Sequence, residues 1–143
     1  MSGAILQRPA LAGVVKLLQS AALPTSDLTD AHMEHFYFCG LRDAPTALVG
    51  LEPRGADALL RSLVVAPDQR DHGIGRSLVK HAENEARARG VKAIYLLTTT
   101  AEAFFSGCGF VSAARDEAPE AIRATREFAE ICPASSVFMM KRS

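Results

Sequence analysis

The sequence predicts a single α/β (α+β) domain over residues 1–143, built on a mixed, mostly antiparallel sheet of about six to seven strands. Three observations carry this prediction. Residues 59–98 have the pattern of a parallel strand-helix-strand unit, residues 35–52 that of an antiparallel hairpin, and residues 119–132 that of an extra helix before the last strand. With 48% hydrophobic residues, the chain can bury one core, and we expect helices on both faces of the sheet.

The central unit begins with an apolar run at residues 59–65, which Pro67 ends as a strand. From Ile74 onward, the apolar residues recur at helical spacing, and they are Ile74, Leu78, Val79, Ala82 and Ala86. Gly90 suits the left-handed residue that closes a helix. Residues 91–98 form the next strand, and a strand-helix-strand connection in one sheet is right-handed.

The segments before this unit read as a short edge strand at residues 4–6, a helix and a hairpin. The helix has Ala10, Val14, Leu17, Leu18 and Ala21 at helical spacing and ends before Pro24. In the hairpin, residues 35–41 and 46–52 flank a turn at residues 42–45. Residues 54–57 make the turn into the central strand.

After the unit, a short helix at residues 101–106 leads to a strand that begins at Phe110 and Val111. Residues 116–132 then favour one full amphipathic helix that Pro133 ends, followed by a last strand at residues 136–141. Three roles are open for the apolar face of this helix: it covers the sheet, forms a lid over an acceptor, or makes a homodimer contact.

The loop at residues 70–75, between strand and helix, is built to bind an anion. The first amides of a helix have no intrahelical acceptor, and Gly73 and Gly75 allow the backbone to curl around a diphosphate. Arg70 can approach the anion from the side. The loop does not match a dinucleotide-binding fingerprint, because Leu78 stands where the third glycine is needed. It does not match a P-loop either, because the lysine of that motif is absent. An ordinary glycine turn is the alternative.

This loop, with the strand before it, resembles motif A of the GCN5-related N-acetyltransferases: Arg or Gln, two residues, Gly, one residue, Gly or Ala. The resemblance implies that the loop amides hold the diphosphate of acetyl-CoA and that the preceding strand pairs with its pantetheine arm. The residues so implied are Leu63, Val64, Val65, Arg70, Asp71, His72, Gly73, Ile74, Gly75 and Arg76. Asp71 stands where the family usually has glycine.

Residues 101–110 resemble the second motif of the same family, a short helix before a Gly-Phe dipeptide. Many members have a tyrosine at the position of Phe105, proposed to protonate the departing thiolate, and this chain lacks that hydroxyl. A thiol pKa of about 8.5 makes the thiolate a tolerable leaving group without it. Phe104 and Phe105 are expected as apolar walls for the cofactor arm, with core packing as the alternative role.

The resemblance extends over nearly the whole chain to a subgroup of arsenic-resistance N-acetyltransferases, which share the segments at residues 23–25, 97–105 and 132–135. It implies direct transfer of an acetyl group from acetyl-CoA to the amine of a small molecule, in a ternary complex. An amino-acid-like toxic compound is one such acceptor. Thr25, Thr98, Thr99 and Thr100 are candidates for binding it, although they also suit helix caps.

No single carboxylate stands out as the catalytic base. An amine like that of lysine is neutral about once in a thousand at pH 7, and a peptide-like α-amine costs only about 1 kcal/mol to deprotonate. A base is therefore helpful rather than obligatory. Asp27, Glu34 and Glu52 are weak candidates that water could link to the site.

Composition excludes several classes. Sixteen basic and sixteen acidic residues balance, with no basic tract for a nucleic acid. No apolar run reaches about 18 residues and no signal peptide opens the chain, so we expect a cytoplasmic protein without a membrane segment. Cys39, Cys108 and Cys132 are scattered, and His32 and His35 have no further ligands clustered with them, so no metal is expected.

Two other functions stay open. The missing hydroxyl at Phe105 permits a module that binds acyl-CoA without turnover, and the helix at residues 119–132 permits a protein-interaction module.

Overall fold

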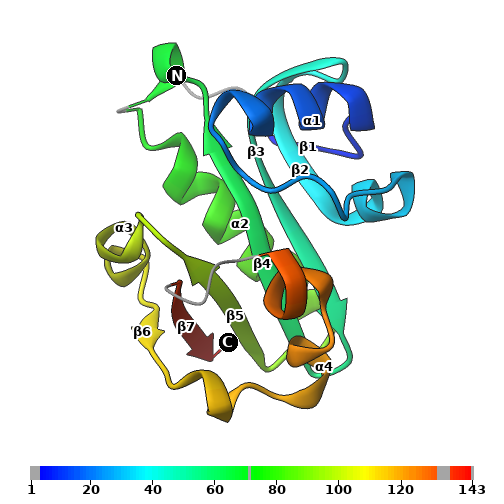
Figure 1. Ribbon diagram of the computed structural model, residues 1–143. Coiled ribbons are helices and arrows are strands. Elements are labelled where there is room, and N and C mark those ends of the chain that lie inside the picture. The colour runs from blue at the N-terminus through cyan, green and yellow to red at the C-terminus, as the bar shows by residue number, and fades with distance from the viewer. Residues whose placement is uncertain (1–3, 71, 132–135, 143) are drawn as a thin grey trace.

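The computed structural model describes residues 4–70, 72–131 and 136–142, and in these ranges seven strands form one sheet in the order β1-β2-β3-β4-β5-β7-β6 (Figure 1). In chain order, the elements are β1 (Leu6–Gln7), α1 (Leu11–Ser20), the 3₁₀ helix η1 (Asp30–His35), β2 (Phe36–Leu41), β3 (Ala44–Arg54), β4 (Asp57–Val65), the 3₁₀ helix η2 (Pro67–Gln69), α2 (Ile74–Ala88), β5 (Ala93–Thr98), α3 (Glu102–Gly107), β6 (Val111–Ser112), the 3₁₀ helix η3 (Arg115–Glu117), α4 (Glu120–Arg123), the π-helix η4 (Glu127–Ile131) and β7 (Val137–Arg142). Only β4 and β5 pair in parallel among these neighbours. The predicted fold class is confirmed.

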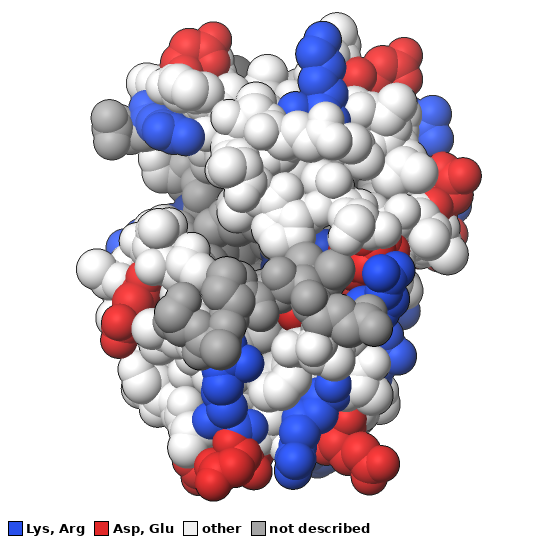
Figure 2. Space-filling view, viewed as in Figure 1, with Lys and Arg blue, Asp and Glu red and all other residues white. Residues whose placement is uncertain are grey.

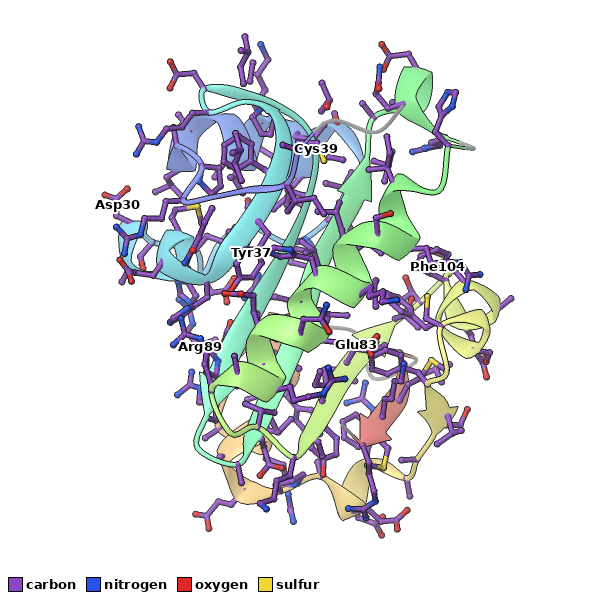
Figure 3. All side chains as sticks on the ribbon, turned by 180° about the vertical axis from the view of Figure 1, so that it is seen from behind. Asp30, Tyr37, Cys39, Glu83, Arg89 and Phe104 are labelled. Atoms are coloured by element: carbon purple, nitrogen blue, oxygen red, sulfur yellow. The ribbon has the colours of Figure 1, made fainter. Side chains whose placement is uncertain are left out.

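Helices α1 and α2 cover opposite faces of the sheet, as Figure 1 shows. Successive side chains of β2 alternate between the faces, so Tyr37 and Cys39 pack in the core under α2, and Phe36 and Phe38 in the core under α1. Figure 3, seen from behind, shows Tyr37 beside α2, which lies in front of the sheet. All five apolar residues predicted for the face of α2 are buried. The periodicity predicted for α2 is therefore confirmed, whereas of the five residues predicted for the first helix only Val14 and Leu18 are buried, and Ala10 and Ala21 flank α1.

The hairpin turn is tighter than predicted, because β3 begins at Ala44 and only residues 42–43 lie between the strands. A bulge at Thr46 explains the difference. Cys39 pairs with Ala47 and Gly40, at φ +95°, pairs with Pro45, so Thr46 is the extra residue and the strands pair up to Leu41 and Ala44. β4 is also longer than the predicted six residues, since Asp57 begins it and its first residues pair with β5.

The single helix predicted over residues 116–132 is wrong. The segment forms the four-residue α4 and then the π-helix η4, while Cys132 lies outside the described residues. The cause is Thr125, which is fully buried: its hydroxyl donates to the carbonyl of Ile122 at 2.7 Å and accepts from the amide of Phe128 at 3.3 Å. A side chain thus replaces backbone partners and interrupts the helical ladder.

The apolar residues of this segment cover the sheet, the first of the three predicted roles. Ala118 and Ile122 are buried in a cluster with Leu59 and Tyr95, and Phe128 packs edge-on against Phe138 at 5.7 Å between ring centroids. The segment therefore closes the α1 face at its lower end, beside β5 and β7.

A bulge in β4 redirects its side chains. Ser62 has φ +62°, and the register with β3 slips at this point. As a result, Leu60 and Leu63 both pack toward the core under α2, although they are three positions apart and regular alternation would put them on opposite faces. Arg61 points instead into the opposite half of the molecule.

The central strands separate before this bulge, after Leu59 of β4. The parallel ladder joins only three residues of β4, Asp57 to Leu59, to Ala93, Ile94 and Tyr95 of β5. Figure 1 shows β4 and β5 side by side near the bottom of the view and diverging upward. Backbone N–H and C=O groups on the exposed side of β4 after Leu59 thus lack a strand partner in β5, and the sheet is open there.

Arg61 forms the centre of a buried ionic cluster with Asp27, Glu52 and Glu127. The guanidinium is completely buried and donates both terminal nitrogens to Asp27, one of them at 2.9 Å to Oδ1. It also lies 2.9 Å from Oε1 of Glu52 and 3.4 Å, through Nε, from Oε2 of Glu127. The cluster ties β3, β4, η4 and the segment after α1 together.

The pKa values in this cluster favour the charged forms. Burial acts to raise the pKa of Asp27, but the hydrogen bonds and charge of Arg61 outweigh it and hold that pKa below its ordinary value. Burial likewise acts to lower the pKa of Arg61, and the surrounding carboxylates raise it above its ordinary value.

In the part of the chain that the structure describes, no helix has both the length and the apolar character needed to cross a membrane.

Asp27→Asn should lower the free energy of unfolding by about 3 kcal/mol at pH 7, because it leaves the buried guanidinium short of a partner. A lowered folded pKa gives stability that is present above the unfolded pKa of 3.8 and is lost as the pH falls through the folded value. Urea unfolding should therefore show the same gap between wild type and variant at about pH 7 and pH 5, and a smaller gap at about pH 3. Asp30→Asn, an exposed acid in η1, is the control and should change stability by less than about 0.5 kcal/mol. A gap that persists unchanged at about pH 3 contradicts the assignment.

Candidate active site

Two cavities occupy the opening between β4 and β5. The first, of about 950 Å³, is called the large cavity; it is lined by residues 21–26, 60–65 and 96–101 with Arg70, Phe105, Glu127 and Ser136. The second, of about 420 Å³, is called the loop cavity; it is lined by residues 63–65 and 73–76 with Gln69, Arg70, Ala101 and Phe104. They share the end of β4, Arg70 and Ala101, so they meet there. Figure 2, viewed as in Figure 1, shows an indentation at the left between the upper and lower parts of the molecule, with charged residues of both signs mainly toward the edges of this face.

The loop cavity contains the first turn of α2. Gly73 precedes this helix with φ +72°, a left-handed conformation that an L side chain rarely adopts. The first helical bond in the turn runs from the amide of Ser77 to the carbonyl of Gly73 at 3.1 Å. The amides of Ile74, Gly75 and Arg76 therefore have no intrahelical acceptor, and the positive end of the helix dipole adds to them. The structure thus brings together the amides expected to hold an anion.

Phe104 forms the wall opposite these amides. A Cβ on Gly75 would lie 3.3 Å from the ring of Phe104 and 3.7 Å from a methyl of Val65. Figure 3 shows Phe104 on α3, beside α2. Glycine at position 75 therefore allows close approach of Phe104, and its backbone angles do not demand glycine.

The charged residues predicted around the loop do not all lie at the loop cavity. Arg70 donates from Nε to the carbonyl of Val65 at 3.0 Å and lines both cavities. Arg76 lines the loop cavity, but its guanidinium donates to the carbonyl of Gly107 at 2.9 Å and ties α2 to α3. His72 is exposed and is not among the residues that line either cavity. Asp71 lies outside the described residues.

The open edge of β4 leads from one cavity to the other. Leu63 and Val65 pack on the α2 side, whereas the side chain of Val64 is buried under α1, so Val64 offers only its backbone to the opening. An extended ligand can add to such an edge as a further strand, by main-chain hydrogen bonds.

Phe105 and the four threonines line the large cavity. The ring of Phe105 is packed edge-on against Phe104 and Phe110, with centroids 5.2 and 5.8 Å away, and is 7% exposed. Phe105 therefore packs in the core and lines the large cavity, whereas its role as a wall for the cofactor arm stays a prediction. Thr98 accepts a hydrogen bond from the amide of Ala101 at 3.0 Å, so its hydroxyl caps the start of α3 while it lines the cavity.

The three carboxylates proposed from the sequence do not line either cavity. Asp27 and Glu52 are bound to Arg61 in the ionic cluster, and Glu34 pairs with Arg8 at 2.9 Å on the surface. Glu127 is the one carboxylate among the described residues that line the large cavity, and it was missed. The π-helix turns it inward, which a regular helical pattern does not predict. The sequence signal that pointed to a further carboxylate was Arg61, a cation in a mainly apolar strand, because a buried guanidinium needs carboxylates around it.

Asp27, His32 and Glu52 also place ligand atoms within 4.8 Å of one another, a grouping that can hold a metal ion. Nε2 of His32 lies 3.6 Å from Oε1 of Glu52. Arg61 already contacts Asp27 and the same oxygen of Glu52, so the guanidinium occupies the position of a cation.

Comparisons with known proteins agree with this geometry. A family model described as "Acetyltransferase (GNAT) family" matches residues 14–110. An amino-acid acetyltransferase of Ralstonia nicotianae is 43% identical over 68 residues, which is 48% of this chain and 15% of that protein. One of Neisseria meningitidis serogroup B is 36% identical over 61 residues, 43% of this chain and 14% of that protein. The matches thus span about a seventh of the length of these relatives.

Solved structures share the fold. N-acetylglutamate synthase of Neisseria gonorrhoeae, complexed with coenzyme A and N-acetyl-glutamate, has a TM-score of 0.79 and 21% identity over 97% of this chain and 34% of that one. A Mycobacterium tuberculosis protein in complex with CoA has a TM-score of 0.75 and 17% identity, covering 98% of this chain and 99% of that one. Because the family model matches more than half of the sequence, the chain belongs to the acetyltransferase (GNAT) family.

Proposed function

We propose that the chain is an N-acetyltransferase that moves the acetyl group of acetyl-CoA to the amine of a small molecule, by direct transfer in a ternary complex. The observation that carries the proposal is the opening of the sheet between β4 and β5, where the helix-start amides and a second, larger cavity meet. One opening with two compartments suits a reaction that brings two substrates together.

The loop cavity and the edge of β4 suit the cofactor. The amides of Ile74, Gly75 and Arg76 would bind the diphosphate, each bond contributing roughly 1.5–3 kcal/mol. The pantetheine arm would pair with the backbone of Leu63 to Val65, between Phe104 and the strand. Val65 lines both cavities, which supports a position for the thioester at their junction. The two solved neighbours that hold coenzyme A support this assignment.

The large cavity suits the acceptor. Its volume of about 950 Å³ is in the range of small-molecule sites. Thr25, Thr98, Thr99 and Thr100 give it hydroxyl groups, and the names of the curated relatives support an amino acid as acceptor. The resemblance to arsenic-resistance acetyltransferases makes an amino-acid-like toxic compound the finer form of this proposal. One catalytic domain over residues 1–143 is part of it.

The chemistry needs a neutral amine and a stabilised oxyanion. Backbone amides near Val65, fixed before the reaction, would stabilise the negative oxygen of the tetrahedral intermediate. Phe105 has no proton to give the leaving thiolate, so water serves, which the thiol pKa of about 8.5 permits.

Arg70→Ala should raise the Kd for CoA about tenfold, because it removes one cation beside the diphosphate. The same variant should bind pantetheine, which lacks the diphosphate, within about twofold of wild type. Isothermal titration calorimetry measures both.

Arg87→Ala is the matched control, since Arg87 is exposed at the other end of α2 and contacts Asn84. It should leave both affinities unchanged. Equal weakening of CoA and pantetheine by Arg70→Ala would show that the diphosphate lies elsewhere.

Thiol release from acetyl-CoA should rise when single amino acids are added to the protein, and the acetylated product should appear by mass spectrometry. A panel of the common amino acids with phosphonic and arsonic analogues identifies the acceptor. CoA binding without thiol release on any acceptor would support the non-catalytic module instead.

A further inference from the structure

We propose that Ser62 and Ser136 bind an acid group of the acceptor, a carboxylate or a phosphonate or arsonate in its place, by donating hydrogen bonds from their hydroxyls. The inference rests on the proposed acetyl transfer and deepens it, because it makes an amine that also carries an anionic oxygen group the substrate class. Neither serine is among the residues that the sequence predicts to bind the acceptor.

Ser136 is a buried hydroxyl without a partner. It directly precedes β7 and is 6% exposed, and its Oγ has no hydrogen-bond partner among the described residues. A buried donor that stays unpaired costs free energy, so folded proteins rarely contain one without a reason. Because Ser136 lines the large cavity, a ligand in that cavity can supply the missing acceptor.

Ser62 lines the same cavity from β4, and its hydroxyl is already held as an acceptor. Nε of Arg61 donates to its Oγ at 2.9 Å. A guanidinium has only donors, so the hydroxyl proton of Ser62 cannot return to Arg61. Within the described ranges, no other hydrogen bond of this hydroxyl is present. The proton is therefore left for a ligand, at a position that the neighbouring cation fixes.

The backbone of Ser62 agrees with a role in binding. Its φ of +62° lies in the left-handed region, which residues other than glycine rarely adopt. Glycine would take this conformation without strain, but it would leave no hydroxyl on the wall of the cavity. Strained residues of this kind cluster at ligand-binding sites.

The chemistry of the two hydroxyls favours an anionic ligand. Each has a proton to donate, and the oxygens of a carboxylate or phosphonate accept such protons in hydrogen bonds that are stronger than those to a neutral oxygen. The charged residues among the described lining of the large cavity are Arg61, Arg70 and Glu127. Two cations and one acid give this lining no excess of negative charge that would exclude an anion.

The positions of the serines also orient the acceptor. Ser62 and Ser136 line only the large cavity, whereas Val65 lines both cavities. The acid group is therefore held apart from the diphosphate of the coenzyme, and the amine of the same molecule is directed toward the junction where the thioester would lie. An amino acid, which carries both groups, fits this arrangement.

Pairs of small molecules that differ only in an acid and its amide test the binding of the anion. L-alanine with L-alaninamide changes the α-acid, and L-aspartate with L-asparagine and L-glutamate with L-glutamine change the side-chain acid. In at least one pair, the acid should raise the melting temperature of the CoA-saturated wild-type protein at pH 7, and the amide at the same concentration should not.

1-Aminoethylphosphonate, which has the skeleton of alanine, separates the two sources of the anion. If it stabilises the protein more than L-alaninamide and no carboxylate does so more than its amide, the acid group is a phosphonate. If neither it nor any acid of the three pairs exceeds its neutral reference, the proposal is overturned.

Ser136→Ala should weaken the binding of the stabilising acid about tenfold and keep the affinity for CoA, as calorimetry measures. It should not lower the free energy of unfolding of the free protein, because it removes a buried hydroxyl that has no partner. Ser62→Gly removes the other hydroxyl at a φ that glycine adopts freely, and it should weaken the same acid about tenfold. Ser106→Ala is the matched control, since this serine of α3 is exposed and lines neither cavity.

Acetylation kinetics separate recognition of the acid from a structural role. The kcat/KM of wild type should favour the acid over its amide, and Ser136→Ala should reduce this preference about tenfold without changing kcat/KM for the amide. Equal losses for acid and amide, or an unchanged affinity for the acid in both serine variants, would overturn the proposal. Failure of wild type to bind CoA would instead overturn the proposed function, so calorimetry with CoA separates the two failures.

Discussion

The separation of β4 from β5 is the constraint on which the rest of the structure depends. A parallel pair joined over only three residues leaves a stretch of β4 with unpaired backbone groups at the centre of the sheet. Such groups need partners, and a stable protein leaves them open only where a ligand or water can serve. The cavities, the loop before α2 and the threonines after β5 are all arranged around this edge.

Two features keep the edge open. The bulge at Ser62 bends β4 directly after Arg61, which regular alternation with Leu60 places on the face away from the core under α2. Arg61 is then held by carboxylates from β3, from η4 and from the segment after α1, which fixes the bend from the opposite face. A cluster of this kind contributes more to a unique geometry than to stability, because removing the charges from water costs several kcal/mol per ion. Here the geometry it defines is the wall of the large cavity.

Local patterns predicted much of this arrangement. The strand at residues 59–65, the glycine loop and the helix from Ile74 were recognisable because their signals are local: β-branched runs, a proline stop and helical spacing. The interruption at Thr125 was not, since it depends on a hydroxyl that finds backbone partners only once the segment is packed. Asp27 and Glu52 were correctly noticed as acids of interest, but their pairing with Arg61 is a contact across the fold. Glu127 was hidden for the same reason.

The central claim is that the diphosphate of the coenzyme lies on the first amides of α2 and its arm along the free edge of β4. Titration of ¹⁵N-labelled protein with CoA, followed by amide chemical shifts, tests it most directly. The account predicts the largest shifts at the amides of Ile74, Gly75 and Arg76, with further shifts from Leu63 to Val65 and none along the far half of α2. Shifts confined to other elements, or none at saturating CoA, would contradict it.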